Sequence, residues 1–452
     1  MAEPLVRLPS ARGGDARAAL GIACGALVLR LLVVARGLHL GLFSDMQEYY
    51  DRAVYLLDHH HFLPDAFRPP AYPVLLAAVF SVFSRSLAAV RITQALLGAA
   101  AAAVTFLLAR RSGSRRAAMC AGVIVAVYPA WCLYPAYVLS ENLFAPLLII
   151  GFWLWFRDSP SNAFAAGLVL GAATLTRTVG VAAIGGILVG EAATGGAQRL
   201  SKHAPALLVG FVLIVGAWTA RNAALYHRFV PIDTNNGYNF LVGNNPQATG
   251  RLELADWDRI HATYLKGAAT DAEANAVAYR EAVRFMREHP GQAAGLAVRK
   301  LQFLIGLEGR EHAWMYGERY WGRVSTPFIW FWGLALLASF PALLTAVIAG
   351  LAGGAARARL DCVFVLTLAM MSGLQLLSFG ETRFHLPWIP LLAIAAGHLF
   401  EPRPERYSRV RLGLAGAALL FLFATWTTQW SGAFAPVRLF ATTPGAPPRL
   451  PY

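Results

Sequence analysis

Stretches of apolar residues recur along the whole chain and are separated by short polar links. The hydrocarbon layer of a bilayer is about 30 Å thick and a helix rises about 1.5 Å per residue, so a span needs roughly 20 apolar residues. The chain is 57% hydrophobic and 14% charged, which is typical of a polytopic membrane protein. We therefore predict an all-α fold with about eleven transmembrane helices. The predicted spans are residues 18–38, 87–109, 117–138, 142–156, 162–176, 178–192, 204–221, 326–350, 360–379, 384–400 and 411–430.

Arginine and lysine residues occupy the N-terminus and every second link of this series. Short loops that carry these residues stay in the cytoplasm, so the pattern predicts a cytoplasmic N-terminus and a multi-pass protein of the inner (plasma) membrane. The net charge of +14 then reflects topology and contact with anionic lipids, and nucleic acid is not expected as a partner. The basic positions are Arg7, Arg12, Arg17, Arg110, Arg111, Arg115, Arg116, Arg157, Arg199, Lys202, Arg357, Arg359, Arg403, Arg406, Arg409 and Arg411.

This topology divides the chain into four parts. Residues 1–221 form an N-terminal membrane module whose first outer loop (39–86) is the predicted catalytic loop. Residues 222–325 form a mostly helical outer segment, residues 326–430 the C-terminal membrane helices, and residues 431–452 a loose outer tail. Within the first loop, residues 71–83 are too short to span, and we predict an interfacial helix there.

Carboxylates collect in the predicted outer links. Asp45 and Glu48 follow the first span by a few residues, and Glu141 stands in the next outer link. Such groups can act as bases or metal ligands, so they are candidate catalytic residues. The simpler alternative is that they end helices and solvate loops.

Three arginines also stand at predicted outer helix ends, namely Arg68, Arg177 and Arg383. Guanidinium groups bind phosphate oxygens in a bidentate manner, which predicts a phosphorylated ligand. The alternative is that each reaches toward lipid headgroups. Arg30 lies deeper, within the first span, and should either pair with an acid of the same site or reach the outer interface.

The long outer segment begins with a run rich in Asn and Gly. Asn235, Asn236, Tyr238 and Asn244 are candidate sugar-binding or acceptor-binding residues, because amides suit sugar hydroxyls. An ordinary surface loop is the alternative. Further on, Thr270 to Glu273 has the pattern of a capping box that starts a helix, and His289-Pro290 should end it.

The sequence lacks the common motifs of nucleotide-binding, zinc-binding and serine-hydrolase sites. The sequence has no Walker A motif, no Rossmann glycine fingerprint, no zinc signature and no nucleophile elbow. The four cysteines lie in or beside apolar helices without metal-ligand spacing, so we interpret them as packing residues. The sequence does not identify a cofactor and leaves a divalent cation possible.

The order of these features resembles the GT-C superfamily of integral-membrane glycosyltransferases, specifically the bacterial branch related to protein O-mannosyltransferases and the lipid A aminoarabinose transferase. The matching pieces are Asp45 to Tyr50, Arg68-Pro69-Pro70-Ala71-Tyr72-Pro73, Ser140-Glu141-Asn142, Thr176-Arg177, the loop from Asn235 to Gly250, and Arg383 to Pro390. Thr178 stands where related enzymes often have Pro, and no acid lies directly beside Asp45.

The resemblance implies transfer of a sugar from a polyprenyl-phosphate donor to an acceptor hydroxyl on a lipid, glycan or protein at the outer face. It implies that Asp45 is the base of an inverting reaction and that Glu141 orients the acceptor or helps to bind a divalent cation. The division of roles between Asp45 and Glu48 stays open, because no acid lies directly beside Asp45. It also implies that Arg68, Arg177, Arg383 and Tyr72 bind the donor phosphate. The main alternative is a flippase or transporter of lipid-linked sugars, but transporters tend to show internal repeats and mid-membrane polar residues, and neither is evident here. A purely structural scaffold would leave the outer acids and arginines without a role.

Overall fold

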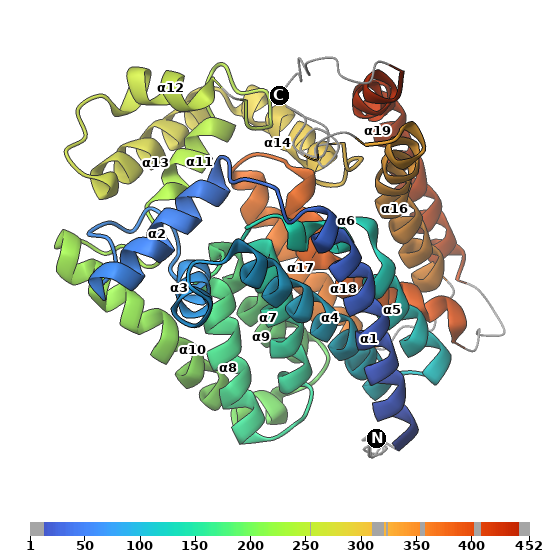
Figure 1. The fold of residues 1–452 in the computed structure, drawn as a ribbon. Coiled ribbons are helices and arrows are strands. Elements are labelled where there is room, and N and C mark those ends of the chain that lie inside the picture. Colours follow the sequence, from blue (N-terminus) through green and yellow to red (C-terminus); the bar gives the residue numbers. More distant parts are fainter. Residues whose placement is uncertain are drawn as a thin grey trace.

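The computed structural model describes residues 13–253, 255–309, 321, 324–352, 358–401 and 408–442. Within these ranges the chain is helical and contains no β-strand, which confirms the predicted all-α class (Figure 1). The elements are α1 (Gly13–Arg36), α2 (Asp45–His59), α3 (Ala71–Phe83), α4 (Leu87–Ser112), α5 (Arg115–Val127), α6 (Pro129–Leu133), η1 (Tyr134–Ala136), α7 (Glu141–Trp155), α8 (Pro160–Thr174), η2 (Thr178–Gly180), α9 (Val181–Ala193), α10 (Ala197–Tyr226), α11 (Asn235–Gly243), α12 (Asp256–Ile260), η3 (His261–Leu265), α13 (Asp271–Glu288), α14 (Pro290–Leu304), α16 (Thr326–Ala352), α17 (Ala358–Leu377), η5 (Thr382–Trp388), α18 (Ile389–Ala396), η6 (Gly397–Phe400) and α19 (Arg409–Thr442).

Six helices of the described residues are long and apolar enough to cross a bilayer, namely α1, α4, α10, α16, α17 and α19. A seventh candidate is the pair formed by α5 and the helical residues Pro129–Ala136, which meet at an angle of 54°. The protein is therefore a multi-pass membrane protein, but the predicted count of about eleven spans is not confirmed. The other apolar segments form shorter helices, such as α7 and α8 with 15 residues each, or are interrupted, as in η5, α18 and η6.

The break between α5 and α6 explains the position of Arg30. Pro129 has no backbone N–H and disfavours helical geometry in the preceding residue, so α5 ends there. The fully buried Arg30 donates hydrogen bonds to the carbonyls of Val125 (2.9 Å) and Ala126 (3.0 Å). Because no water is available inside the membrane, these carbonyls need such a donor. The prediction that Arg30 pairs with an acid or reaches the interface is wrong.

Two short helices, α2 and α3, connect α1 to α4. Helix α3 has the bounds predicted for an interfacial helix, and its 13 residues rise about 20 Å, less than the hydrocarbon thickness. Edge-to-face ring pairs join α2 to α3, with centroids 5.0 Å apart for Tyr49 and Tyr72 and 5.3 Å apart for Tyr50 and Phe80. These contacts hold α2, whose first turn carries Asp45, against α3.

The segment between α10 and α16 is mostly helical where it is described. The Thr270 hydroxyl accepts a hydrogen bond from the Glu273 N–H (3.1 Å), and the Glu273 carboxylate accepts one from the Ala269 N–H (3.0 Å). This is the predicted capping box with one difference. The Glu273 carboxylate accepts from the N–H of Ala269, the residue before the N-cap Thr270, and not from the N–H of Thr270 itself. Helix α13 ends just before His289 and Pro290, as predicted. Helices α11, α12 and α13 gather at one end of the molecule beside α2 (Figure 1).

The basic residues of the predicted inner links meet at the other end. Asp15, in the first turn of α1, pairs with Arg110 at the end of α4 (3.2 Å). Asp158, just after α7, pairs with Arg199 at the start of α10 and with Arg359 at the start of α17. The opposite end of α7 lies beside α2, where the Tyr49 hydroxyl donates to the Ser140 hydroxyl (3.2 Å), and the opposite end of α17 lies beside the end of α11, where Asn244 donates to the Leu377 carbonyl (2.6 Å). These ion pairs are therefore separated from the polar residues around α2 and α11 by the length of the helices. Arg7, Arg12, Arg357, Arg403 and Arg406 lie outside the described residues.

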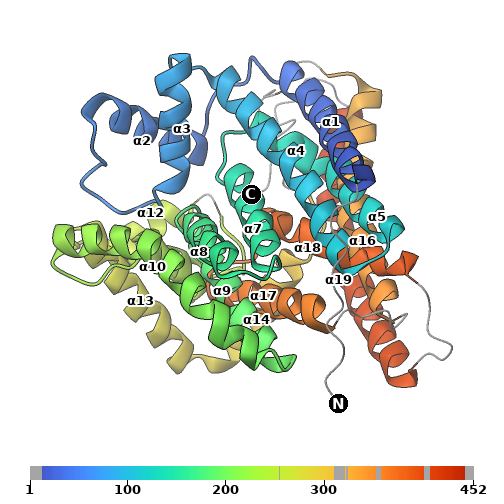
Figure 2. The same cartoon turned by 90° about the horizontal axis from the view of Figure 1, so that it is seen from below.

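Helix α19 corrects the prediction of a loose tail from residue 431. It continues to Thr442, and its last turns bury Val437 and Phe440. Gly333 of α16 makes this possible, because a Cβ there would lie only 2.5 Å from a Val437 methyl group. Helices α16 and α19 accordingly run side by side in both views (Figures 1 and 2). Residues 443–452 lie outside the described residues.

Candidate active site

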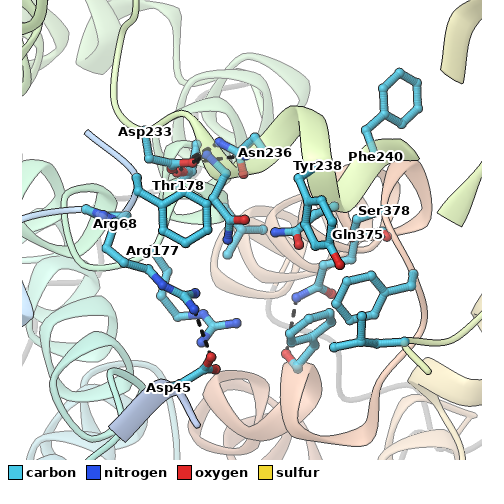
Figure 3. Close-up of a pocket in the computed structure, with 18 of the residues that line it drawn as sticks. Asp45, Arg68, Arg177, Thr178, Asp233, Asn236, Tyr238, Phe240, Gln375 and Ser378 are labelled. Carbon is cyan, nitrogen blue, oxygen red and sulfur yellow. Dashed lines mark hydrogen bonds and ion pairs between the residues drawn. The ribbon is translucent and has the colours of Figure 1, made fainter. Parts of the chain in front are cut away.

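A cavity of about 880 Å³ lies among α2, η2, α11, the end of α17 and η5. One side carries charged residues from α2, the loop before α3, η2 and η5. The facing side carries amides and aromatic rings from α11, α12 and α13 (Figure 3). Of the predicted site residues, eight line this cavity: Asp45, Glu48, Arg68, Arg177, Arg383, Asn235, Asn236 and Tyr238.

Asp45 lies between two arginines. Arg68 Nη2 donates to Asp45 Oδ1 (2.8 Å) and Arg383 Nη1 donates to Asp45 Oδ2 (3.1 Å). Burial by itself raises the pKa of Asp45, but the charges of Arg68, Arg383 and Arg177 outweigh it and hold this pKa well below its ordinary value. The residue before it, Ser44, has φ of 49°, a sparsely populated conformation that turns the chain directly into α2. Asp45 is therefore an ionised, oriented carboxylate at neutral pH.

Arg68 bridges Asp45 and Glu48. Its Nε donates to Glu48 Oε2 (2.8 Å), while Glu48 Oε1 accepts from Arg52 Nε (3.2 Å). The two acids are three residues apart on α2 and so share one helix face, which allows a single guanidinium to reach both. The rings of Tyr49 and Phe67 flank the Arg68 guanidinium at 5.6 and 5.3 Å. Glu48 thus holds the arginine, while Asp45 lies deeper among the three cations.

Glu141 holds the third arginine. It begins α7, is 2% exposed, and its Oε1 lies 2.7 Å from Arg177 Nη1. Ser140 joins the same group, since its hydroxyl oxygen accepts from Arg177 Nη1 (3.2 Å) and from the Tyr49 hydroxyl (3.2 Å). Arg177 faces the cavity, and Glu141 is not among the residues that line it. The acid therefore orients Arg177 from behind.

Asp233 is a buried acid of the cavity wall that sequence reasoning missed. Its carboxylate accepts hydrogen bonds from the Thr178 hydroxyl and from the backbone N–H groups of Asn235 and Asn236 (3.1 Å each). Burial raises the pKa of Asp233, against the lowering effect of these donors. The interaction joins η2 to the start of α11, as Figure 3 shows for Thr178, Asp233 and Asn236. Asp233 thereby fixes the amide side of the cavity relative to the arginine side.

Besides Glu141, two other predicted site residues do not line the cavity. Tyr72 is fully buried and donates its hydroxyl hydrogen to Gln94 Oε1 (2.5 Å). Asn244 caps the end of α17 by donating to the Leu377 carbonyl (2.6 Å), and its Oδ1 accepts from Lys300 Nζ (2.9 Å). Both have packing and capping contacts in this structure.

The cavity also contains residues that the sequence did not single out. Trp257 and Tyr279 add aromatic surface, and Gln375 is a polar residue within an otherwise apolar stretch of α17. A polar residue in a membrane helix is a usable signal, because such residues are costly there and tend to face a site. The sequence around Trp257 contains no such signal. Trp257 lines the cavity only because α12 packs against α11.

The carboxylates do not fit a divalent cation. Within the part of the chain that is described, no group of three or more His, Cys, Asp or Glu side chains is placed to hold a metal ion. Asp45, Glu48 and Glu141 each face an arginine at 2.7 to 2.8 Å, and a cation would have to displace it.

Residues 67–219, about a third of the chain, match the family model described as dolichyl-phosphate-mannose-protein mannosyltransferase. The match includes Arg68, Glu141 and Arg177, and it confirms the resemblance seen in the sequence. Over these residues the chain is similar to that mannosyltransferase family. No curated protein sequence matches it.

The chain is also similar to solved structures at low sequence identity. The Archaeoglobus fulgidus oligosaccharyltransferase in complex with Zn and sulfate has a TM-score of 0.51 and 16% identity, covering 94% of this chain and 52% of that one. ArnT from Cupriavidus metallidurans, bound to undecaprenyl phosphate, has a TM-score of 0.44 and 16% identity, with 94% and 68% covered. AglB from Archaeoglobus fulgidus, in complex with an inhibitory peptide and a dolichol-phosphate, has a TM-score of 0.46 and 13% identity, with 97% and 57% covered. The chain thus spans little more than half of the length of the oligosaccharyltransferase chains.

Proposed function

We propose that this protein transfers a sugar from a polyprenyl-phosphate carrier to an acceptor hydroxyl, with inversion and with Asp45 as the base. The observation that carries the proposal is the position of Asp45 between Arg68 and Arg383 on the wall of a cavity. The description of the matching family names a dolichyl-phosphate-linked mannose, which supports a lipid-phosphate donor. The acceptor is a hydroxyl of a lipid, glycan or protein.

The arginines suit the leaving group of this reaction. A polyprenyl-phosphate sugar is a phosphodiester with one negative charge, and the polyprenyl phosphate that departs carries two. Arg68 and Arg383 stabilise the second charge as it develops, and Arg177 lies on the same wall. The leaving group therefore needs no general acid.

Donor binding itself activates the base. While Arg68 and Arg383 bind Asp45, its low pKa makes it ionised but weakly basic. Phosphate oxygens compete for the same guanidinium groups, so donor binding weakens both ion pairs and raises the pKa of Asp45 toward its ordinary value. Asp45 becomes an effective base only when the donor is in place, which limits unproductive chemistry.

The bonds change in one inverting displacement. The acceptor oxygen attacks the anomeric carbon from the face opposite the phosphate and forms the new C–O bond. The bond between the anomeric carbon and the phosphate oxygen breaks, and both of its electrons leave with polyprenyl phosphate. The acceptor proton passes to Asp45, while Glu48 and Glu141 keep Arg68 and Arg177 in position.

We further propose that the cavity opens at the outer face of the inner membrane, with the N-terminus in the cytoplasm. The basic links at the opposite end of the helices support this orientation. A lipid carrier is the expected donor there, because the outer side has no pool of nucleotide sugars.

Mass spectrometry of the lipids that co-purify with Asp45→Asn protein tests the proposal. The variant lacks the base and frees Arg68 and Arg383 for phosphate, so a polyprenyl-phosphate sugar should accumulate on it. Asp51→Asn is the matched control, because Asp51 is an exposed acid of the same helix that does not line the cavity. The control should retain turnover and hold less of this lipid. Normal turnover by Asp45→Asn, or a bound lipid of another class, would contradict the proposal and favour the transporter alternative.

A further inference from the structure

The cavity wall opposite the arginines carries polar groups that have no partner within the described residues. Asn235 and Asn239 lie four residues apart on α11 and therefore share one helix face. Both line the cavity, as does Tyr238, and the side chains of these three residues make no hydrogen bond in the described part of the chain. Figure 3 shows α11 across the cavity from Asp45. These amides and the hydroxyl are free to bind a ligand rich in hydroxyl groups.

An aromatic platform adjoins this polar face. The Trp257 ring is 46% exposed although three rings hold it, with centroid distances of 4.0 Å to His261, 5.0 Å to Tyr238 and 5.9 Å to Phe67. Tyr279, on α13, is 41% exposed on the same wall. A rigid, half-exposed indole beside unpaired amides suits the apolar face and the hydroxyl rim of a pyranose ring. A peptide backbone or a polyprenyl chain would use only one of these two features.

The Trp257 ring lies close to the side of the cavity that carries Arg68, where the donor phosphate is proposed to bind. Phe67 contacts both parts, with its centroid 5.3 Å from Arg68 Cζ and 5.9 Å from the Trp257 ring, so the indole lies at most about 11 Å from the guanidinium. Two linked sugar rings can bridge this distance. One ring would be the sugar on the donor phosphate, and the other would belong to the molecule that receives it.

We propose that the acceptor is a carbohydrate, a glycan or glycolipid whose pyranose ring stacks on Trp257 and bonds to Asn235, Asn239 and Tyr238. This inference rests on the proposed function and names its acceptor class. The acceptor hydroxyl then faces Asp45, which lies on the opposite wall. Trp257 and Asn239 determine specificity for the acceptor and have no part in donor binding.

Saturation-transfer difference NMR tests this with the full-length protein in detergent, saturated with undecaprenyl phosphate. The probes are millimolar methyl glycosides and short oligosaccharides of glucose, mannose and galactose, beside short Ser/Thr peptides. We expect saccharide binding by the wild type, a loss of about tenfold in affinity for Trp257→Ala, and a loss of about threefold for Asn239→Ala. Trp257→Phe keeps an aromatic face and should bind nearly as well as the wild type. Phe229→Ala is the matched control, because Phe229 is 79% exposed in the same segment and does not line the cavity.

Undecaprenyl phosphate binding, measured on every variant, separates the two proposals. Unchanged lipid binding together with reduced saccharide binding in Trp257→Ala supports the carbohydrate acceptor. Binding of Ser/Thr peptides but of no saccharide, or equal saccharide binding by wild type and Trp257→Ala, would overturn it while the donor proposal stands. If the wild type does not bind undecaprenyl phosphate, the proposed function itself fails.

Discussion

The pH dependence of protein stability at Lys300 tests how the end of α17, next to the cavity, is held in place. Lys300 lies on α14, is 1% exposed, and has no acidic partner among the described residues. Its Nζ donates to Asn244 Oδ1 (2.9 Å) and to the Leu376 carbonyl (3.0 Å), and so caps the end of α17 just before the chain turns to Arg383. Burial lowers the pKa of Lys300 from 10.5 to about 8.

The sign of the effect follows from proton linkage. Between pH 8 and 10.5 the unfolded chain binds a proton at Lys300 that the folded protein has released, so the free energy of unfolding rises with pH. At about 1.36 kcal/mol for each pH unit, the full rise is about 3 kcal/mol. The neutral amine can still donate to both oxygens, so deprotonation removes the cost of the buried charge without breaking the cap.

Lys300→Met removes the titrating group, and Lys266→Met is the control at an exposed lysine. Thermal unfolding in detergent should show that the stability of the wild type relative to Lys300→Met increases by about 2 kcal/mol, on the order of 2 °C in Tm, between pH 8 and 10. Lys266→Met should follow the wild type throughout. A constant difference between wild type and Lys300→Met at all pH values would refute the reasoning, since the buried lysine would then keep an ordinary pKa.

Three further predictions address the donor, the packing and the topology. Arg68→Ala should raise the KM for a polyprenyl-phosphate sugar at least tenfold and leave the acceptor KM nearly unchanged, and steady-state kinetics that show an unaltered donor KM would contradict its phosphate role. Gly186→Leu should destabilise the protein by about 3 kcal/mol or more in thermal unfolding, because a Cβ there would lie 2.8 Å from the backbone of α17, whereas Gly373→Leu meets open space and should have little effect. Thr249→Cys should react with an impermeant maleimide on intact cells and Ser161→Cys only after lysis, and the reverse pattern would invert the proposed orientation.

Elements defined by local signals could be predicted from the sequence. The bounds of α3 and the start of α13 were predicted closely, because a Pro-flanked apolar run and a capping box act within a few residues. The arginines and acids of the cavity were selected because charged residues are rare in such an apolar chain. Their position at helix ends then brought them together once the helices packed.

Features that depend on tertiary contacts could not be predicted. Arg30 binds backbone carbonyls that are free only because α5 breaks at Pro129, and a hydropathy pattern does not show where those carbonyls lie. Asn244 resembles a sugar-binding amide in sequence but caps α17, which is more than a hundred residues away. The count of spans depends in the same way on breaks and bends that average hydropathy does not detect.

The charge balance of the site explains why the proposed base, Asp45, and the arginines that would bind the donor phosphate belong to one network of ion pairs. The connected groups, counted as ionised, are four carboxylates and four guanidiniums, so the network is formally neutral before the donor binds. Ion pairs join Asp45, Glu48 and Asp65 to Arg52, Arg68 and Arg383. The pair formed by Glu141 and Arg177 adjoins them through Ser140, which accepts from Arg177 and from the Tyr49 hydroxyl, and the Tyr49 ring lies beside Arg68. When the acceptor proton reaches Asp45, the network gains one positive charge at the moment the departing phosphate gains its second negative charge. Proton transfer and departure of the phosphate therefore stabilise each other, and Asp45→Asn, whose network is permanently cationic, should bind both the donor and the released polyprenyl phosphate more tightly than the wild type.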